Sequence, residues 1–202
     1  MMPPPALTPD ELAALQNTEF FKLKQRATAK LLQLFGGLAQ NMKQLPEHQN
    51  FDFPAGCDVQ LGKISKGENY QNLPYMVLDF PRLFKSGDIF ACRTLFWWGH
   101  GFSFTLLLQG NSLHRFWPAI SSNFHRLSGQ NYYLSVAETP WRHEFTSNTY
   151  QPCSRFGTAE LEQQVLRHGF CKIALPLPLE QWNSVPEAGL QAYRQFLQLL
   201  TV

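Results

Sequence analysis

The chain has 202 residues, of which 44% are hydrophobic and 14% aromatic, whereas only 16% are charged and the formal net charge is +2. This balance excludes an intrinsically disordered chain, which would be rich in charge and poor in aromatic residues, and it indicates one globular domain with a substantial core. It also argues against a nucleic-acid-binding protein, because the one basic run lies on a predicted helix without interleaved aromatic residues (Lys22, Lys24, Arg26 and Lys30).

A short helix is predicted after a proline-rich tip, residues 1–7, which we expect to be flexible. Thr8 precedes Pro9 and lies three residues before Glu11, which is the pattern of a capping box. The helix that this box begins is expected to end at about Gln16.

A long amphipathic helix is predicted from Thr18 to the residue before Pro46. Apolar side chains recur there every three or four positions and form one continuous stripe. Gly36 and Gly37 interrupt this helix, and each costs about 1 kcal/mol relative to alanine in a helix interior. We expect a kink or the close approach of another segment at the two glycines. The pattern leaves open whether they break the helix.

The middle of the chain changes to a period of two residues, which predicts strands. The first predicted elements are strands at 57–65 and 73–80, joined by a loop at 66–72, and a hairpin of strands at 88–98 and 102–109. A helix at 112–127, a strand at 131–138 and a further short strand at 141–146 follow. The chain is then predicted to form a helix at 158–168 followed by Gly169, a strand at 170–177 and a helix at 186–200. Strands therefore cluster centrally and helices lie at both ends. This order predicts an α+β fold, with a mainly antiparallel central sheet flanked by N- and C-terminal helices, in a single domain over residues 1–202.

The stretch FWWGHGFSF, Phe96–Phe104, predicts the turn of the central hairpin. A three-residue turn, Gly99–Gly101, pairs Trp98 with Phe102 and gathers apolar side chains on one face of the two strands. A two-residue turn would instead bring Arg93 into that apolar layer, where an unpaired arginine is costly. We therefore favour the longer turn, which makes Trp98 and the phenylalanines part of the core.

The opposite face of these strands combines polar and aromatic side chains, which is typical of the floor of a cleft. Strand parity places part of the preceding strand on the same side. The predicted mixed face consists of Tyr75, Asp79, Arg93, Trp97, Ser103 and Thr105. An ion pair between Asp79 and Arg93 has two interpretations, a structural cross-strand pair or a polar anchor in a pocket.

The sequence GENY lies in the predicted loop at 66–72, beside the mixed face. Its polar side chains, Glu68, Asn69 and Tyr70, could bind a polar ligand at the rim of a site, because functional groups often occupy loops on rigid scaffolds. Alternatively, Asn69 stabilises the turn of its own backbone. The pattern does not favour one interpretation over the other.

Other reactive groups form no recognised motif, and no cofactor or metal can be assigned. The chain contains no GxSxG, P-loop or GxGxxG sequence, its four cysteines form no CxxC pair, and its histidines lack the spacing of metal ligands. The sequence RHE, Arg142–Glu144, lies in the predicted strand at 141–146, where neighbouring side chains point to opposite faces. These absences lower the expectation of a common hydrolase, kinase or dehydrogenase.

The block Gly62–Gly110, which begins GKISKGENYQNLPYMVLDF and includes the hairpin, resembles an uncharacterised family of small bacterial proteins of the kind found in Bacteroidota-like genomes. The resemblance covers about a quarter of the chain. It implies a bacterial cytoplasmic protein and carries no activity, ligand or catalytic residue.

The favoured hypothesis is a noncatalytic domain that binds a small molecule or a partner on the mixed face, with residues 68–70 at the rim. A structural or homo-oligomeric protein, in which the long N-terminal helix covers that face, is the alternative. An enzyme is the least favoured hypothesis and would use Asp79 or Glu68 as a general base and Arg93 to hold an anion. The first residues lack the basic and apolar regions of a signal peptide, and no run of about 20 apolar residues could span a bilayer. We therefore expect a soluble cytoplasmic protein without a membrane or nucleic-acid partner.

Overall fold

The computed structural model describes residues 4–201. The chain divides into two compact units, residues 1–34 and residues 35–202. Of the predicted flexible tip, residues 1–3 lie outside the described residues, and residues 4–7 are exposed and have no regular secondary structure. The extent of the domain stays a prediction.

The first unit is helical and begins with the predicted capping box. The Thr8 hydroxyl accepts a hydrogen bond from the Glu11 amide at 3.2 Å, and the Glu11 carboxylate accepts one from the Thr8 amide at 2.7 Å. Helix α1 (Pro9–Gln16) follows, and α2 (Thr18–Gln44) then continues into the second unit. Gly36 and Gly37 do not break α2. A Cβ atom at either glycine would meet no atom within 4 Å, so the expected close approach is absent from the described structure.

The second unit contains a seven-stranded sheet in the order β1-β2-β3-β4-β7-β5-β6, in which every pair of strands is antiparallel. The strands are β1 (Lys63–Tyr70), β2 (Leu73–Lys85), β3 (Asp88–Trp97), β4 (Gly101–Gln109), β5 (Tyr133–Ser135), β6 (Tyr150–Pro152) and β7 (Phe170–Leu177). The predicted α+β fold with a mainly antiparallel central sheet is therefore confirmed.

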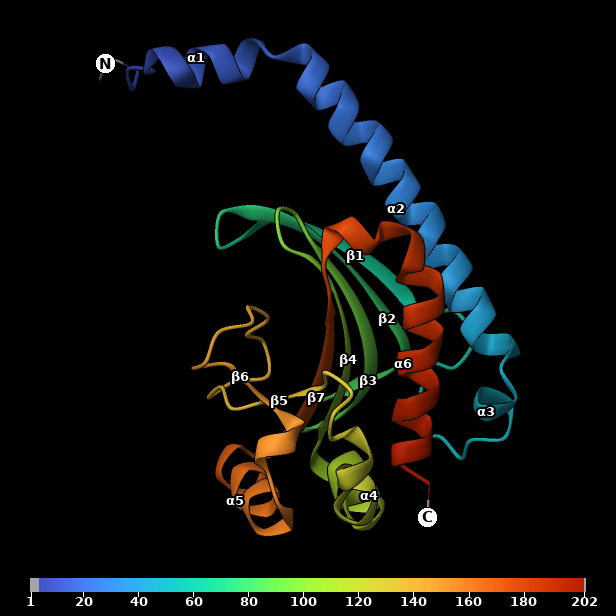
Figure 1. Cartoon of the computed structure of the whole chain (residues 1–202). Coiled ribbons are helices and arrows are strands. Elements are labelled where there is room, and N and C mark those ends of the chain that lie inside the picture. The colour runs from blue at the N-terminus through green and yellow to red at the C-terminus, as the bar shows by residue number, and fades with distance from the viewer. Residues whose placement is uncertain (1–3, 202) are drawn as a thin grey trace. The chain divides into compact units, whose positions relative to one another are not determined.

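Helices in this unit lie along the convex side of the sheet and at one of its ends (Figure 1). They are α3 (Pro46–Gln49), α4 (Gly110–Asn123), α5 (Thr158–His168) and α6 (Val185–Leu199), with short 3-10 turns at Phe124–Leu127, Cys153–Arg155 and Leu179–Ser184. Figure 1 shows that the sheet is strongly curved, that α6 runs along its convex side and that the segment around β5 and β6 lies on its concave side. None of the helices within residues 4–201 is both long enough and apolar enough to cross a membrane.

The convex side of the sheet holds the main hydrophobic core. Phe35 of α2 contacts Phe102 of β4 with ring centroids 6.4 Å apart. Gly189 lets α6 approach closely, because a Cβ atom there would lie 2.8 Å from the ring of Phe104. The part of α2 in this unit therefore covers the apolar face of the sheet, and the alternative in which the helix covers the mixed face is wrong for residues 35–44.

The hairpin of β3 and β4 has a three-residue turn at a different place from the one predicted. Phe96 pairs with Phe102, so Trp98 begins the turn and is half-buried instead of belonging to the core. The predicted pairing of Trp98 with Phe102 is wrong by two residues. Because the offset is even, every side chain of the two strands keeps its predicted face.

Backbone packing explains the position of this turn. Gly101 has a φ of +107°, and a Cβ atom on it would lie 2.7 Å from the carbonyl oxygen of Leu177 in β7. Gly101 thus pairs with Trp97 as the first residue of β4, which moves the turn one residue toward the N-terminus.

The predicted loop at 66–72 is also wrong. Strand β1 continues to Tyr70 with an irregularity after Gly67, and only Gln71 and Asn72 form the turn into β2. Both have positive φ values, 50° and 65°, as a tight two-residue hairpin requires. The GENY residues therefore lie on a strand, where pairing with β2 satisfies their backbone.

Three further predicted strands are absent or shorter. Of the strand predicted at 131–138, only β5 (Tyr133–Ser135) forms. Residues 57–62 form only one isolated bridge, between Asp58 and Arg82, because β1 begins at Lys63. Residues 141–146 form no strand and belong instead to an irregular loop between β5 and β6.

Candidate functional site

The predicted mixed face lies on the concave side of the sheet. Asp79 pairs with Arg93, Arg93 with Thr105, and Thr105 with Ala174, so alternate residues of four strands share one surface. The same alternation adds Lys172 of β7, whose partner across the sheet is Leu107. We define the mixed face by its polar and aromatic members, which are Tyr75, Asp79, Arg93, Trp97, Ser103, Thr105 and Lys172.

Asp79 and Arg93 form the predicted ion pair. Arg93 donates from Nε to Oδ1 of Asp79 at 2.7 Å and from an Nη atom to Oδ2 at 3.0 Å. The side chains are only 9% and 15% exposed, and the guanidinium also lies 5.6 Å from the ring of Trp141. Both carboxylate oxygens of Asp79 are thus engaged by one guanidinium, which leaves this carboxylate poorly placed to accept a proton as a general base.

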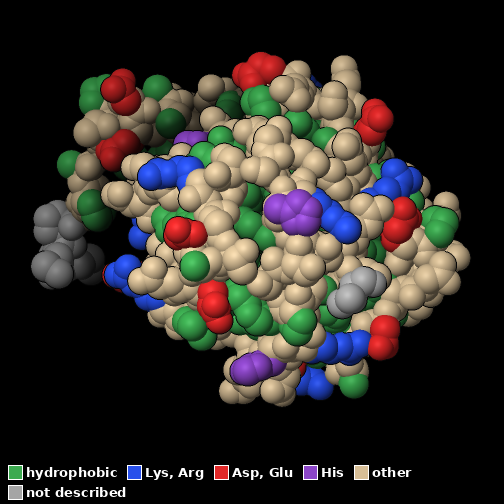
Figure 2. Space-filling view, turned by 60° about the horizontal axis from the view of Figure 1, so that its bottom comes forward, with side chains coloured by type: hydrophobic (Ala, Val, Ile, Leu, Met, Phe, Trp, Pro, Cys, Tyr) green, Lys and Arg blue, Asp and Glu red, His purple; other side chains and the backbone are tan. Residues whose placement is uncertain are grey.

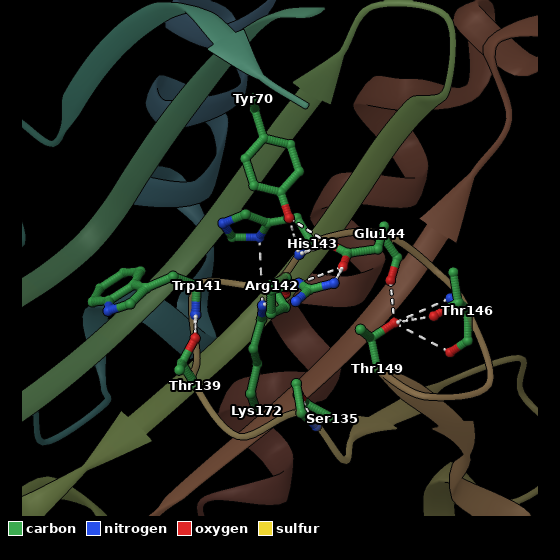
Figure 3. Close-up of polar contacts among 11 residues, drawn as sticks. Tyr70, Ser135, Thr139, Trp141, Arg142, His143, Glu144, Thr146, Thr149 and Lys172 are labelled. Carbon is green, nitrogen blue, oxygen red and sulfur yellow. Dashed lines mark hydrogen bonds and ion pairs between the residues drawn. The ribbon is translucent and has the colours of Figure 1, made fainter. Parts of the chain in front are cut away.

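A loop of 14 residues, 136–149, covers part of this face; we call it the covering loop. Pairing of β5 with β6 brings its two ends together, and the Val136 amide donates to the Thr149 carbonyl at 2.9 Å. Loops of this length without secondary structure of their own are uncommon in compact domains and are usually functional or disordered. This one is ordered by side-chain contacts, which Figure 3 shows.

Tyr70 and Glu144 form the centre of the network that holds the covering loop (Figure 3). The Tyr70 hydroxyl donates to the Glu144 carboxylate and accepts a hydrogen bond from the His143 amide at 2.8 Å. Arg142 forms an ion pair with the same carboxylate. Burial alone would raise the pKa of Glu144, but the hydrogen bonds from Arg142, Tyr70 and the backbone outweigh it and lower the pKa to about 2. Glu144 is therefore ionised and fully committed to this network.

Lys172 is the most deeply buried ionisable group of the mixed face, with 1% of its surface exposed. Its ammonium donates to the carbonyl oxygens of Pro140 at 2.8 Å and Arg142 at 2.5 Å, and contacts Nδ1 of His143 at 3.4 Å. Burial, with a smaller contribution from Arg93, lowers its pKa to about 7 despite the opposing effect of Glu144. The three groups that the ammonium contacts all belong to the covering loop.

His143 is uncharged in this environment. Burial first, and then the nearby charges of Lys172 and Arg93, lower the pKa of His143 to about 2. A neutral imidazole can accept the proton of Lys172 at Nδ1. The side chain also stands edge-on to Tyr70, with ring centroids 5.4 Å apart.

Trp97 lies at the other end of the mixed face and carries an unsatisfied donor. His100 stacks on its indole at 3.6 Å between ring centroids, and Tyr70 stands edge-on at 5.1 Å. Trp97 is buried, yet its Nε1 has no hydrogen-bond partner among the described residues. Ser103 and Thr105 are buried residues of the same face and add hydroxyl groups to it. Buried polar groups are nearly always paired, so the indole N–H of Trp97 indicates a place where water or a ligand completes the structure.

The three predicted rim residues, Glu68, Asn69 and Tyr70, do not form one group in the structure. Tyr70 joins the mixed face through its ring, and Tyr75 packs against it with centroids 6.2 Å apart. Asn69 accepts a hydrogen bond from the Asn72 amide at 3.1 Å, as expected if it stabilises its own turn. Glu68 is exposed on β1.

Sequence reasoning missed the contribution of the covering loop and of β7. The RHE residues do not alternate along a strand, and their side chains and backbone meet Tyr70 and Lys172 instead. Lys172 had a local signal, since it is the one charged residue in the otherwise apolar strand FCKIALPL. The loop had none, because its contacts join residues about 30 to 70 positions apart.

A cavity of about 810 Å³ lies elsewhere, among α3, α4 and the end of α6. Its volume suits a small molecule. However, its Arg115 is already paired with Asp52, an exposed residue, and Arg126 is exposed on its rim. One carboxylate oxygen of Glu47 in this cavity is also buried without a hydrogen-bond partner. We favour the mixed face because its charged residues are more deeply buried, Lys172 and Asp79 above all. In the part of the chain that the structure describes, no three histidine, cysteine, aspartate or glutamate side chains are placed to hold a metal ion.

On the face of the molecule shown in Figure 2, acidic and basic side chains are interspersed and do not gather in one patch. Comparisons with known proteins found no matching family model, no similar curated protein and no similar solved structure.

Proposed function

We propose that this chain is a noncatalytic small-molecule-binding domain whose site is the mixed face beneath the covering loop. Cytoplasmic location is part of the proposal and is supported by the four cysteines, which are all free. A bacterial origin rests on the resemblance of residues 62–110 alone.

The indole N–H of Trp97, which is buried and has no hydrogen-bond partner among the described residues, is the observation that carries this proposal. Ser103 and Thr105 add hydroxyl groups on the same face, on strands whose backbone is fixed by the sheet. An aromatic ring with a few convergent polar groups is the usual composition of a small-molecule site. The covering loop supplies the movable wall that access to a buried face requires, because irregular segments open more readily than paired strands.

Binding is favoured over catalysis because the carboxylates of the mixed face and of the covering loop are engaged, and Glu68, the other base expected from the sequence, is exposed on β1. Asp79 accepts two hydrogen bonds from Arg93, and Glu144 accepts from both Tyr70 and Arg142. A general base needs a free lone pair within reach of its substrate. Neither carboxylate offers one without breaking an ion pair.

Oligomer formation is a second candidate, supported by exposed apolar side chains in the first unit. Large apolar residues of α1 and of the first half of α2 are about half exposed, namely Leu12, Leu15, Phe20, Phe21 and Leu23. Such patches often mark interaction surfaces. Sedimentation of the wild type and of a Leu15→Ser, Leu23→Ser variant would test this, and equal monomeric masses would contradict it.

A thermal-shift screen against small metabolites tests the binding function, because a ligand of the folded state raises the melting temperature by mass action. Each hit is then measured with Trp97→Phe, which removes the orphan N–H and keeps an aromatic ring. Loss of one hydrogen bond should weaken binding about tenfold. Trp98→Phe, a change to the neighbouring half-buried indole, is the matched control and should leave the affinity unchanged. Equal affinities for both variants, or no hit at all, would contradict the proposal.

A further inference from the structure

We propose that the ligand of the mixed face carries an anionic group, such as a carboxylate, and that the ammonium of Lys172 receives this group in place of the covering-loop carbonyls. This inference rests on the proposed function, because it names the chemistry of the molecule bound there.

The first support is that the ammonium of Lys172 has hydrogen-bond partners but no directly paired negative charge. Its contacts are two carbonyl oxygens and one imidazole nitrogen, all of which are neutral. Among residues 4–201, no carboxylate lies within 4 Å of its ammonium, and the ring of Tyr150 lies 5.3 Å from it. Buried lysines are normally paired with an opposite charge, because burial of a lone charge is costly.

The second support is the balance of charge around this ammonium. Arg93 faces it from β3 and is neutralised by Asp79, whereas Glu144 faces it from the covering loop and is neutralised by Arg142. His143 is uncharged. The carboxylates of the layer are therefore committed, and Lys172 is left with a surplus positive charge. An anionic ligand would neutralise this surplus charge, a neutral ligand would leave the charge buried and unpaired, and a cationic ligand would be repelled by it.

The third support is that the present partners of Lys172 can leave without disturbing the sheet. Pro140, Arg142 and His143 belong to the covering loop, whereas Lys172 is held on β7, which pairs with β4 along its whole length. Displacement of the loop would expose an ammonium on a rigid floor. Tyr70 contacts both His143 and Trp97, so only two side chains separate the ammonium from the orphan indole N–H. A ligand with an aromatic ring and a carboxylate fits this arrangement.

Titration calorimetry with benzoate and its neutral isostere benzamide tests the inference, with acetate and acetamide as a smaller pair. Benzoate should bind at least about tenfold more tightly than benzamide near neutral pH. Because the free ammonium has a pKa of about 7 and a bound anion raises it, the benzoate affinity should fall about tenfold per pH unit above pH 7 and level off below pH 6. Measurements in two buffers of different ionisation enthalpy should show uptake of close to one proton per benzoate at pH 8.

Two variants test whether Lys172 is the residue that causes the preference for benzoate and the proton uptake. Lys172→Met should abolish both the preference for benzoate and the proton uptake, whereas Lys85→Met, at an exposed lysine at the end of β2, should retain both. If Lys172→Met does not fold, the pH dependence and proton uptake of the wild type decide the question. Benzamide binding as tightly as benzoate, or benzoate binding that does not vary with pH, would overturn the inference and leave the proposed function standing. If all ligands found by the screen depend on Trp97 but are neutral or cationic, the inference is also overturned and the proposed function remains. If the screen finds no ligand, the proposed function itself is overturned.

Discussion

Arg93 and Asp79 are joined by two parallel hydrogen bonds, of 2.7 and 3.0 Å, across neighbouring antiparallel strands. This geometry holds the guanidinium in one orientation on the mixed face, since a bidentate pair fixes direction as well as distance. The pair also neutralises two charges that would each be costly to bury alone. The same contact thus serves the stability of the sheet and the shape of the candidate site.

Replacement of Asp79 by asparagine should destabilise the fold by about 3 kcal/mol, because it leaves the charge of Arg93 largely buried and unpaired. Chemical denaturation measures the change in the free energy of unfolding. Asp52→Asn is the control, since the Asp52–Arg115 pair is exposed to solvent and should contribute less than about 1 kcal/mol. Equal effects of the two variants would show that the Asp79–Arg93 pair is solvated. A loss of stability without any effect on the binding of a ligand found by the screen would support a purely structural pair.

Tyr70 should hold the covering loop in place through its hydroxyl. Tyr70→Phe removes the donor to Glu144 and one of the two acceptors of the His143 amide, the other being the Glu144 carboxylate at 3.0 Å. The loss should cost about 1–2 kcal/mol and speed hydrogen exchange at that amide. Tyr75→Phe is a matched control, because the Tyr75 hydroxyl makes no hydrogen bond in the described chain and its loss should cost less than about 0.5 kcal/mol. Unchanged exchange at His143 in Tyr70→Phe would mean that other contacts hold the loop.

Much of the fold could be predicted because Arg93, Ser103 and Thr105 mark one parity of β3 and β4 as the more polar face. Phe90, Phe104 and Leu108 have their predicted face, and so do Arg93 and Trp97 on the opposite one. Alternation defines the face of each side chain but not its partner, since a shift of two residues leaves the pattern unchanged. The turn of the β3–β4 hairpin was therefore predicted at the correct length and at the wrong place.

The covering loop could not be predicted in the same way. Its residues follow no period, and its order comes from contacts with Tyr70 and Lys172, which are distant in sequence. Charged residues such as Glu144 normally face solvent, and only its partner Tyr70, from a distant strand, reveals that this one is buried. The mixed face could thus be predicted as a surface, whereas the wall above it required the tertiary structure.

Gly101 should be the least replaceable glycine of the central hairpin. Alanine there would combine a positive φ with a Cβ atom 2.7 Å from the Leu177 carbonyl, and we expect a loss of about 2–3 kcal/mol. Gly99 also has a positive φ, but the nearest atom to its Cβ position is 4.0 Å away, so Gly99→Ala should cost only about 1 kcal/mol. Thermal or chemical denaturation of the two variants measures this difference. A Gly101→Ala variant as stable as Gly99→Ala would contradict the observed packing of β4 on β7.

Lys172 should add a contribution to stability that rises with pH above about 7. Its pKa is about 7 in the folded chain and 10.5 ordinarily, so the unfolded chain binds more protons between these values. The free energy of unfolding therefore contains a contribution that increases with pH from about 7 upward, by as much as about 1 kcal/mol per pH unit. Lys172→Met lacks this contribution, whereas Lys85→Met, at an exposed site, keeps it. Urea denaturation of the three proteins at pH 7.0 and 8.5 measures the difference. Burial keeps the four cysteine thiols protonated in the folded chain, so their ionisation in the unfolded chain opposes the rise, but it does so equally in all three proteins. The comparison of Lys172→Met with the wild type and Lys85→Met therefore isolates the contribution of Lys172. If the free energies of unfolding of the wild type and Lys172→Met changed in parallel with pH, the ammonium of Lys172 would have to be hydrated or paired in the folded chain. The buried surplus charge that favours an anionic ligand would then not exist.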